Sequence, residues 1–243
     1  MYLLVYVDDI IMTGNCPQFL SSLIAQLGTA FILKDLGPLY YFLGLQVTRI
    51  SKGLFLSQSK YAQGLLLKLN MQSSKHAHTP CAPHCRLVTH EGLVLSNPHE
   101  YRSLVGSLHY LTFTLLDLSF AVQQVCQFLS IPIDAHMVVA KRILRYLNGT
   151  LNFGVYLRPG PISLSAFSNS DWAGDPFDRR STTGYIVYLG YNPNTWSGKK
   201  QDTISRSSTE FEYRALASIV AKLYWLHQVL KDLGLFLPPP PKL

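Results

Sequence analysis

The chain opens with the stretch MYLLVYVDDIIMTGN, residues 1–15, in which two adjacent aspartates lie between two apolar runs. The apolar run Met1–Val7 predicts a buried core strand, and Ile10–Thr13 predicts its returning partner in a hairpin. Asp8 and Asp9 would then lie together at the hairpin tip, where their charges repel and lose hydration. Hairpin turns favour Asp mostly as Asp-Gly, whereas an isoleucine follows here. Turn formation alone and a bound cation both remain open explanations, and the flanking strands favour the cation.

The chemistry that suits this aspartate pair is the binding of a divalent metal ion. Mg²⁺ prefers carboxylate oxygens as ligands. Two such ions, about 3.5–4 Å apart, drive phosphoryl transfer in polymerases. We therefore take Asp8 and Asp9 as candidate Mg²⁺ ligands.

The composition is that of a folded protein with a basic surface. The 243 residues allow one large domain or two small ones, and 48% hydrophobic content provides for a core. The formal net charge is +7, which either keeps the protein in solution or attracts a polyanion such as nucleic acid. The basic residues cluster in three places: Lys141, Arg142 and Arg145; Arg179 and Arg180; Lys199, Lys200 and Arg206.

Cysteine usage and hydropathy indicate the environment. Cys16, Cys81, Cys85 and Cys126 are too few and too scattered for a disulfide scaffold, so no disulfide partner is expected. A reduced, intracellular setting fits best, with nucleus, cytoplasm and mitochondrion all open. No apolar run approaches the roughly 18 residues of a membrane span, and no secretory signal opens the chain. Because domains rarely begin within a strand, we expect further residues upstream in the parent protein.

Residue periodicity predicts an α+β fold without internal repeats. Helices are expected at Phe19–Leu27, Ser59–Leu69, 101–130, Asp134–Leu147 with Asp134 as its cap, and Ser207–Leu233. Strands are expected at Tyr40–Ile50, Leu54–Leu56, Ser163–Phe167 and Thr183–Leu189, with one short strand in 149–161. Residues 73–98 predict a long loop, and a domain boundary is expected near 158–162.

A second pair of carboxylates lies near the start of the last predicted helix. Ser207 and Glu210 fit a capping box. At helical spacing, Glu212 shares the apolar stripe that faces the sheet, whereas Glu210 lies nearly opposite. Asp171 follows a short strand and could approach Glu212 across the fold. The alternative is that Glu212, close to the helix end, simply reaches water. The stripe consists of Leu216, Ile219, Leu223, Leu226 and Leu230.

Two further segments contain residues that could bind a ligand: a basic helix and a segment rich in His and Cys. Lys141, Arg142 and Arg145 share one predicted helix, where they contact phosphates or form an ordinary solvated face. The segment KHAHTPCAPHCRLVTH, residues 75–90, is rich in potential zinc ligands. Zinc sites pair their ligands at tighter spacing and add a second, separate pair, so this segment argues against zinc. Its potential ligands are His76, His78, Cys81, His84, Cys85 and His90.

An ordered set of motifs resembles the Pol polyprotein of copia-type LTR retrotransposons. The motifs are YLLVYVDDIIMTG, LKDLGPLYYFLGLQV, GLFLSQSKYAQGLL, YRSLVGSLHYLT, AKRILRYLNGT, SDWAGDPFDRRSTTGYIVYLG and SRSSTEFEYRALA. The resemblance runs from residue 1 to about 235 and is strongest to short stand-alone plant reading frames, mitochondrial and nuclear.

The resemblance implies a division of the chain. Residues 1–57 would be a reverse-transcriptase palm remnant, with YVDD as the palm motif, Asp8 and Asp9 as catalytic Mg²⁺ ligands, and a second hairpin holding the primer end. Residues 58–160 would be thumb and connection, and 161–237 an incomplete RNase H-like α/β domain. A proline-rich tail, 238–243, follows. Asp171 and Glu212 would be catalytic, with Glu212 a metal ligand. The implied partners are RNA–DNA hybrid or duplex nucleic acid.

Departures from the family pattern argue against independent catalysis. The palm needs a third carboxylate from an earlier strand. The first RNase H motif reads SNSDWAG instead of SDSDWAG or SDADWAG, so Asn169 replaces the likelier metal ligand with an uncharged amide. The segment TFTLLDLSF departs from the family's usual TRPD, so a basic residue is lost there. The closing PPPPKL cannot continue a strand.

Three readings of function follow. The first is an enzyme that performs reverse transcription and RNA hydrolysis. The second is a non-catalytic binder of hybrid or duplex nucleic acid, in which Lys141, Arg142 and Arg145 contact phosphates. The third is a decayed remnant with open sheet edges and exposed apolar surface. We expect the isolated chain to be catalytically inactive.

Overall fold

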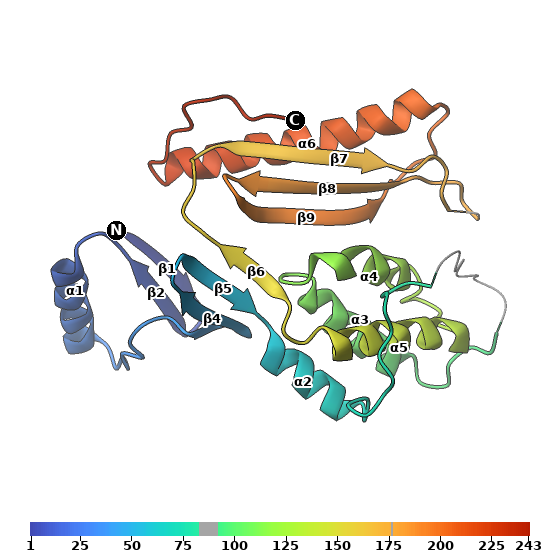
Figure 1. The fold of residues 1–243 in the computed structure, drawn as a ribbon, viewed down its shortest axis with the longest axis horizontal. Coiled ribbons are helices and arrows are strands. Elements are labelled where there is room, and N and C mark those ends of the chain that lie inside the picture. The colour runs from blue at the N-terminus through green and yellow to red at the C-terminus, as the bar shows by residue number, and fades with distance from the viewer. Residues whose placement is uncertain (83–91, 176) are drawn as a thin grey trace.

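The protein combines three antiparallel sheets with α-helices, and a computed structural model describes residues 1–82, 92–175 and 177–243 (Figure 1). The sheets contain two, four and three strands. The α+β class that the sequence predicts is confirmed.

The first sheet is the hairpin that contains the aspartate pair. Strands β1 (Tyr2–Tyr6) and β2 (Asp9–Thr13) pair antiparallel, with Tyr6 opposite Asp9. The hairpin itself was expected, but its burial was not. Every residue of β1 is exposed, and the following helix α1 (Pro17–Ala30) contains no buried residue. The expectation of a core strand is wrong, because the hairpin forms a separate two-stranded sheet and does not join a larger one.

The second sheet joins two segments that lie far apart in the sequence. Its order is β3 (Tyr41–Phe42), β4 (Leu45–Ile50), β5 (Gly53–Ser57) and β6 (Gly154–Leu157). The strand expected at Tyr40–Ile50 is divided by a tight turn at Leu43 and Gly44, whose φ angles are 46° and 76°. Positive φ at both central residues is the requirement of a type I′ hairpin turn.

Between β5 and β6 the chain forms the main hydrophobic core. Helices α2 (Ser59–Lys68), α3 (Pro98–Leu111), α4 (Ser119–Cys126) and α5 (Asp134–Gly149) pack together, with the short 3₁₀ helix η1 (Leu116–Leu118) before α4. The helix expected over 101–130 is thus broken into two. Tyr101 is fully buried and its hydroxyl donates to the Val125 carbonyl oxygen at 2.7 Å, while burial raises the pKa of that phenol. This contact ties α3 to α4.

The start of α5 differs by one residue from the prediction. Ile133 has the extended backbone of a capping residue, and Asp134 is the first residue inside the helix. The Ile133 N–H donates to Nδ1 of His136 at 3.2 Å, and Asp134 Oδ1, one residue inside the helix, accepts from the Ala135 N–H at 2.8 Å. The predicted cap is therefore wrong.

The third sheet carries a long helix on one face. Strands β7 (Leu164–Ser170), β8 (Thr182–Leu189) and β9 (Asn192–Lys200) are antiparallel neighbours in chain order. Helix α6 (Ser208–Asp232) packs its apolar side on β7 and β8, and α4 packs near β9 (Figure 1). The sequence did not predict β9, because NPNTWSGKK is poor in β-forming residues.

The proline-rich tail closes one edge of this sheet. Lys242 donates its N–H to the Leu164 carbonyl oxygen at 3.0 Å and accepts from the Ala166 N–H at 2.8 Å. The bridge is parallel to β7. PPPPKL forms no strand, as expected, but Lys242 makes an isolated bridge, since the first residue after the prolines again has an N–H to donate.

Across the described segments, no helix is both long and apolar enough to span a membrane.

Candidate nucleic-acid and metal-binding residues

The aspartate pair lies at the tip of the first hairpin. Val7 and Asp8 form the turn, and Val7 has φ 51°, a conformation that a β-branched residue rarely adopts. Asp8 and Asp9 are both exposed. Nowhere in residues 1–82, 92–175 and 177–243 do three His, Cys, Asp or Glu side chains come together as metal ligands. A two-ion centre needs several converging carboxylates, so the pair alone does not fit one.

Asp171 is held by its own loop. It follows β7, and its Oδ1 accepts a hydrogen bond from the Thr182 N–H at 2.5 Å. A Cβ added at Gly174 would lie 1.9 Å from Asp171 Oδ2, so the carboxylate rests directly against the glycine backbone. The role that this geometry shows is to close the loop between β7 and β8.

Asn169 and Glu212 lie on opposite sides of the third sheet. Leu164 and Ala166 are buried under α6, so strand alternation directs Phe167 and Asn169 to the other face. There, Asn169 and Asp171 line an open groove of about 530 Å³ between the sheet and α4. The structure therefore does not bring position 169 to the helix that carries Glu212.

Glu212 is exposed in the first turn of α6. A helix turns by about 100° per residue, so Glu212 lies on the same side of α6 as the buried residues, which span the angular range from Phe211 to Leu223. Glu212 thus lies on the side of the helix that its spacing predicts, but its side chain is exposed to solvent. The buried residues are Phe211, Ala215, Ile219, Leu223, Leu226 and Leu230.

The predicted cap of α6 is present. The Ser207 hydroxyl accepts from the Glu210 N–H at 3.2 Å. The Glu210 carboxylate accepts from the Arg206 N–H at 2.7 Å and from the Arg214 guanidinium at 2.6 Å. Glu210 thus has a structural role, as the sequence indicated.

A glutamine that sequence reasoning missed connects the parts of this region. The Gln201 Nε2 lies 3.3 Å from the Ser170 hydroxyl, 3.0 Å from the Thr183 hydroxyl and 3.1 Å from the Phe211 carbonyl oxygen, and its two N–H groups are shared among these acceptors. It therefore links β7, β8 and the start of α6. The sequence offers no signal for this role, because Gln201 follows a strand that was not predicted.

The loop after β7 is fastened by an ion-pair cluster. Lys200 Nζ lies 2.6 Å from Asp175 Oδ2 and 2.8 Å from Asp178 Oδ2, and donates to Gln127 at 3.1 Å. Burial acts to raise the pKa of Asp175, but hydrogen bonds from Lys200 and two backbone N–H groups outweigh it and lower that pKa. Lys200 is thereby engaged within the protein.

The basic cluster on α5 is partly covered. Lys141 is exposed, whereas Arg142 and Arg145 are half-buried. The Arg142 guanidinium donates to the Thr79 hydroxyl at 2.9 Å, and the Ala77 N–H donates to the Arg145 carbonyl at 3.3 Å. The segment before residue 83 thus lies along this side of α5. Of the potential zinc ligands there, His84, Cys85 and His90 lie outside the described residues.

The chain is similar to reverse transcriptases and to the Pol polyproteins of plant retrotransposons. Residues 1–83 match the reverse transcriptase (RNA-dependent DNA polymerase) family. The chain is 48% identical over 242 residues to the retrovirus-related Pol polyprotein from transposon RE1 of Arabidopsis thaliana, covering 99% of this chain and 16% of that protein. The polyprotein from transposon RE2 of the same plant is 47% identical over 242 residues, covering 99% of this chain and 17% of that protein.

A shorter relative has almost the same extent as this chain. An uncharacterised mitochondrial protein of Arabidopsis thaliana is 47% identical over 226 residues, covering 93% of this chain and 94% of that protein. No solved structure matches the chain. The chain belongs to the reverse-transcriptase family of copia-type retrotransposon Pol proteins, and it spans about a sixth of the two polyproteins' length.

Proposed function

We propose that this chain is a nucleic-acid-binding segment of a copia-type reverse transcriptase that does not catalyse turnover by itself. The β1–β2 hairpin and strands β3–β5 correspond to the palm remnant at 1–57. Helices α2–α5 correspond to thumb and connection at 58–160, and the third sheet with α6 to the RNase H-like part at 161–237. The observation that carries the proposal is family membership along almost the whole chain, together with the net charge of +7.

The proposed ligand is RNA–DNA hybrid or duplex nucleic acid, bound by the α5 cluster. Lys141 is its exposed member, and Arg142 and Arg145 contribute from half-buried positions. Cations on a helix contact phosphates without reading sequence, and they release counterions when they do so.

Binding is tested with a labelled RNA–DNA hybrid and duplex DNA across a salt series. Affinity should fall steeply with salt, and Lys141→Gln should reduce the slope of log K against log salt by about 1. Lys242→Gln, a lysine in the tail, is the matched control. Failure of the wild-type chain to bind at low salt would refute the proposal.

The proposed lack of turnover rests on the carboxylates. In the family, Mg²⁺ would be held by Asp8 and Asp9 in the palm and by Glu212 in the RNase H-like part, where Asp171 would also be catalytic. Here Asn169 replaces one carboxylate and lies on the sheet face opposite α6. These carboxylates do not fit a two-ion centre, which needs several converging ligands.

Catalysis is tested with a hybrid and Mg²⁺. We expect no cleavage of the RNA strand by the wild-type chain, and none from Asn169→Asp, since that substitution restores only one carboxylate. Cleavage that Glu212→Gln abolishes would instead establish the enzyme reading.

A further inference from the structure

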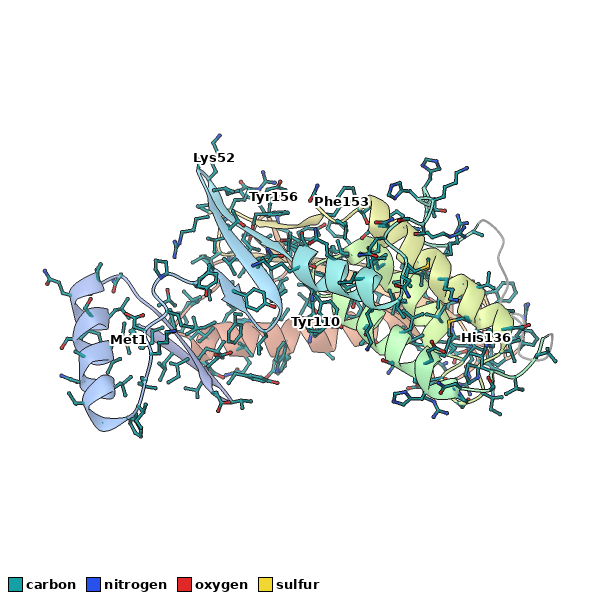
Figure 2. All side chains as sticks on the ribbon, turned by 90° about the horizontal axis from the view of Figure 1, so that it is seen from below. Met1, Lys52, Tyr110, His136, Phe153 and Tyr156 are labelled. Carbon is teal, nitrogen blue, oxygen red and sulfur yellow. The ribbon has the colours of Figure 1, made fainter. Side chains whose placement is uncertain are left out.

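Strand β1 has an open outer edge. In the part of the chain that the structure describes, the hairpin is a separate two-stranded sheet, so β1 pairs only with β2. The residues of β1 are 43–58% exposed. Figure 2 shows Met1, next to β1, and His136, in α5, toward opposite ends of the molecule, so the hairpin lies away from the helical core.

The register of the hairpin defines which backbone groups this edge presents. Tyr6 and Asp9 flank the two-residue turn, so they form a hydrogen-bonded pair. Bonded and non-bonded pairs alternate along an antiparallel ladder, which directs the backbone groups of Leu3 and Val5 away from β2. The N–H and C=O groups of these two residues are therefore the donors and acceptors that a further strand would bond.

The hairpin needs a further strand and nothing in its sequence blocks one. A two-stranded hairpin is marginally stable in water at best, and independent stability takes three or more strands with a hydrophobic face. Strand β1 reads YLLVY, so both of its faces are apolar or aromatic. Exposed edges are usually protected from pairing by Lys or Pro. The first Lys or Arg of this sequence is Lys34 and the first Pro is Pro17, so β1 contains neither protection.

The sequence of β1 is complementary to itself in an antiparallel arrangement. When two copies meet about a two-fold axis at Leu4, Leu3 of each copy lies opposite Val5 of the second copy. Both residues point their backbone groups outward, so each such pair exchanges both of its N–H···O hydrogen bonds. On the axis, Leu4 meets Leu4 of the second copy, and Tyr2 meets Tyr6, which are favourable cross-strand pairs.

Charge selects this antiparallel arrangement over a parallel one. The charged side chains among residues 1–33 are Asp8 and Asp9 alone, at the hairpin tip. A parallel pair would place the two acidic tips side by side, where they repel. In the antiparallel register the two copies of Asp8 lie about 27 Å apart along the strands, well beyond the Debye length of about 8 Å at physiological salt.

We infer that this chain forms a weak two-fold symmetric dimer, in which the outer edges of β1 pair and the two hairpins become one continuous sheet. A contact between two edge strands falls below about 1,200 Å² of buried surface, the range of weak and transient complexes. Dilution therefore separates the copies, and the β1 amides then exchange freely with solvent. The inference is independent of the proposed function, because it uses neither Lys141 nor any other cation.

The test is sedimentation equilibrium of the full chain, without nucleic acid, over a wide range of concentration. The wild-type chain should change from monomer to dimer as the concentration rises. Val5→Pro removes an outward N–H and none that β2 needs, so it should weaken the dimer about tenfold or more. The matched control is Ile10→Pro, since Ile10 lies opposite Val5 and its N–H faces the other edge of the hairpin. It should leave the dimer unchanged.

A pair of charge variants tests the register without proline. Leu4→Lys and Leu4→Glu each place like charges opposite one another on the two-fold axis, so each variant alone should be monomeric at concentrations where the wild type dimerises. An equimolar mixture of the two should dimerise again, because opposite charges then face each other. Recovery in the mixture excludes an unfolded hairpin as the cause of the loss.

Three results would overturn the inference. A wild-type chain that stays monomeric at every concentration means that no second copy pairs with this edge. Loss of the dimer with Ile10→Pro and not with Val5→Pro means that β2 provides the paired edge. A mixture of the two Leu4 variants that stays monomeric contradicts the register with Leu4 on the axis.

Discussion

Gly53, at the start of β5, is a position in the second sheet that requires glycine. Its φ is 147°, and an added Cβ would lie 1.9 Å from the Leu157 carbonyl oxygen. Both strain and a backbone clash oppose any larger residue there. We expect Gly53→Ala to lower the free energy of unfolding by about 2 kcal/mol or more, measured by urea denaturation.

The matched control is a glycine with free space. Gly106, within α3, has no atom within 4 Å of its added Cβ. Gly106→Ala should raise the free energy of unfolding by about 0.5–1 kcal/mol, because alanine favours the helix. Equal effects at the two positions would show that the approach of Leu157 to Gly53 is unimportant.

Gln201 concentrates several hydrogen bonds in one side chain. Replacing it with methionine, which has similar length but no amide, leaves Ser170, Thr183 and Phe211 without its donors. We expect a loss of about 1–3 kcal/mol in denaturant unfolding. Gln228→Met, on the exposed side of α6, should be nearly neutral. A neutral Gln201→Met would mean that water replaces the amide without loss.

Local patterns were predictable at the residue scale, and contacts between distant residues were not. The Ser207 cap was predicted because its partner lies three residues away. The cap of α5 was misassigned by one residue, because Ile133, which has no side-chain acceptor, precedes the helix and Asp134 lies inside it. Gln201 could not be predicted, since its partners meet only after β7, β8 and α6 have assembled. The site roles of Asp8, Asp9, Asp171 and Glu212 remain predictions.

At the scale of elements, the loop between β7 and β8 depends on a charge. The folded-state pKa of Asp175 is lowered, so its carboxylate stabilises the fold above its ordinary pKa of about 3.9 and loses this effect as pH falls below that value. We expect Asp175→Asn to lower the melting temperature at pH 7, and the difference from wild type to shrink below about pH 4.

Asp202→Asn is the control for this pH series, since Asp202 is an exposed acid beside the same sheet. It should leave the melting temperature at pH 7 nearly unchanged, because Asp202 makes no ion pair among the described residues. A constant difference between Asp175→Asn and wild type across pH would show that the Lys200 cluster does not stabilise the loop electrostatically.

Element boundaries were predictable where periodicity was strong. Most helices begin and end near the expected residues, because an apolar stripe and flanking polar residues define them. The turn at Leu43 was missed because leucine rarely has positive φ. The burial of β1 was predicted wrongly, since apolar composition indicates what a strand can bury and not what covers it.

For the whole molecule, the distribution of buried residues predicts uneven stability. The core cluster joins α2, α3, α4 and α5, whereas β1 and α1 bury nothing. Amides in β1, β2 and α1 should exchange hydrogen with solvent much faster than those in α3 and α5, as measured by mass spectrometry. Equal protection in both regions would show that the hairpin is covered in solution.

The pairing of β5 with β6 has a consequence for how this chain can vary. Ser57 is opposite Gly154, so the backbone leaves the sheet and returns to it one strand spacing away, about 4.8 Å. The helices between them are therefore, topologically, a single very long hairpin loop. The distance between the two ends of this insert is therefore fixed by the β5–β6 pair, whatever the length of the chain between them.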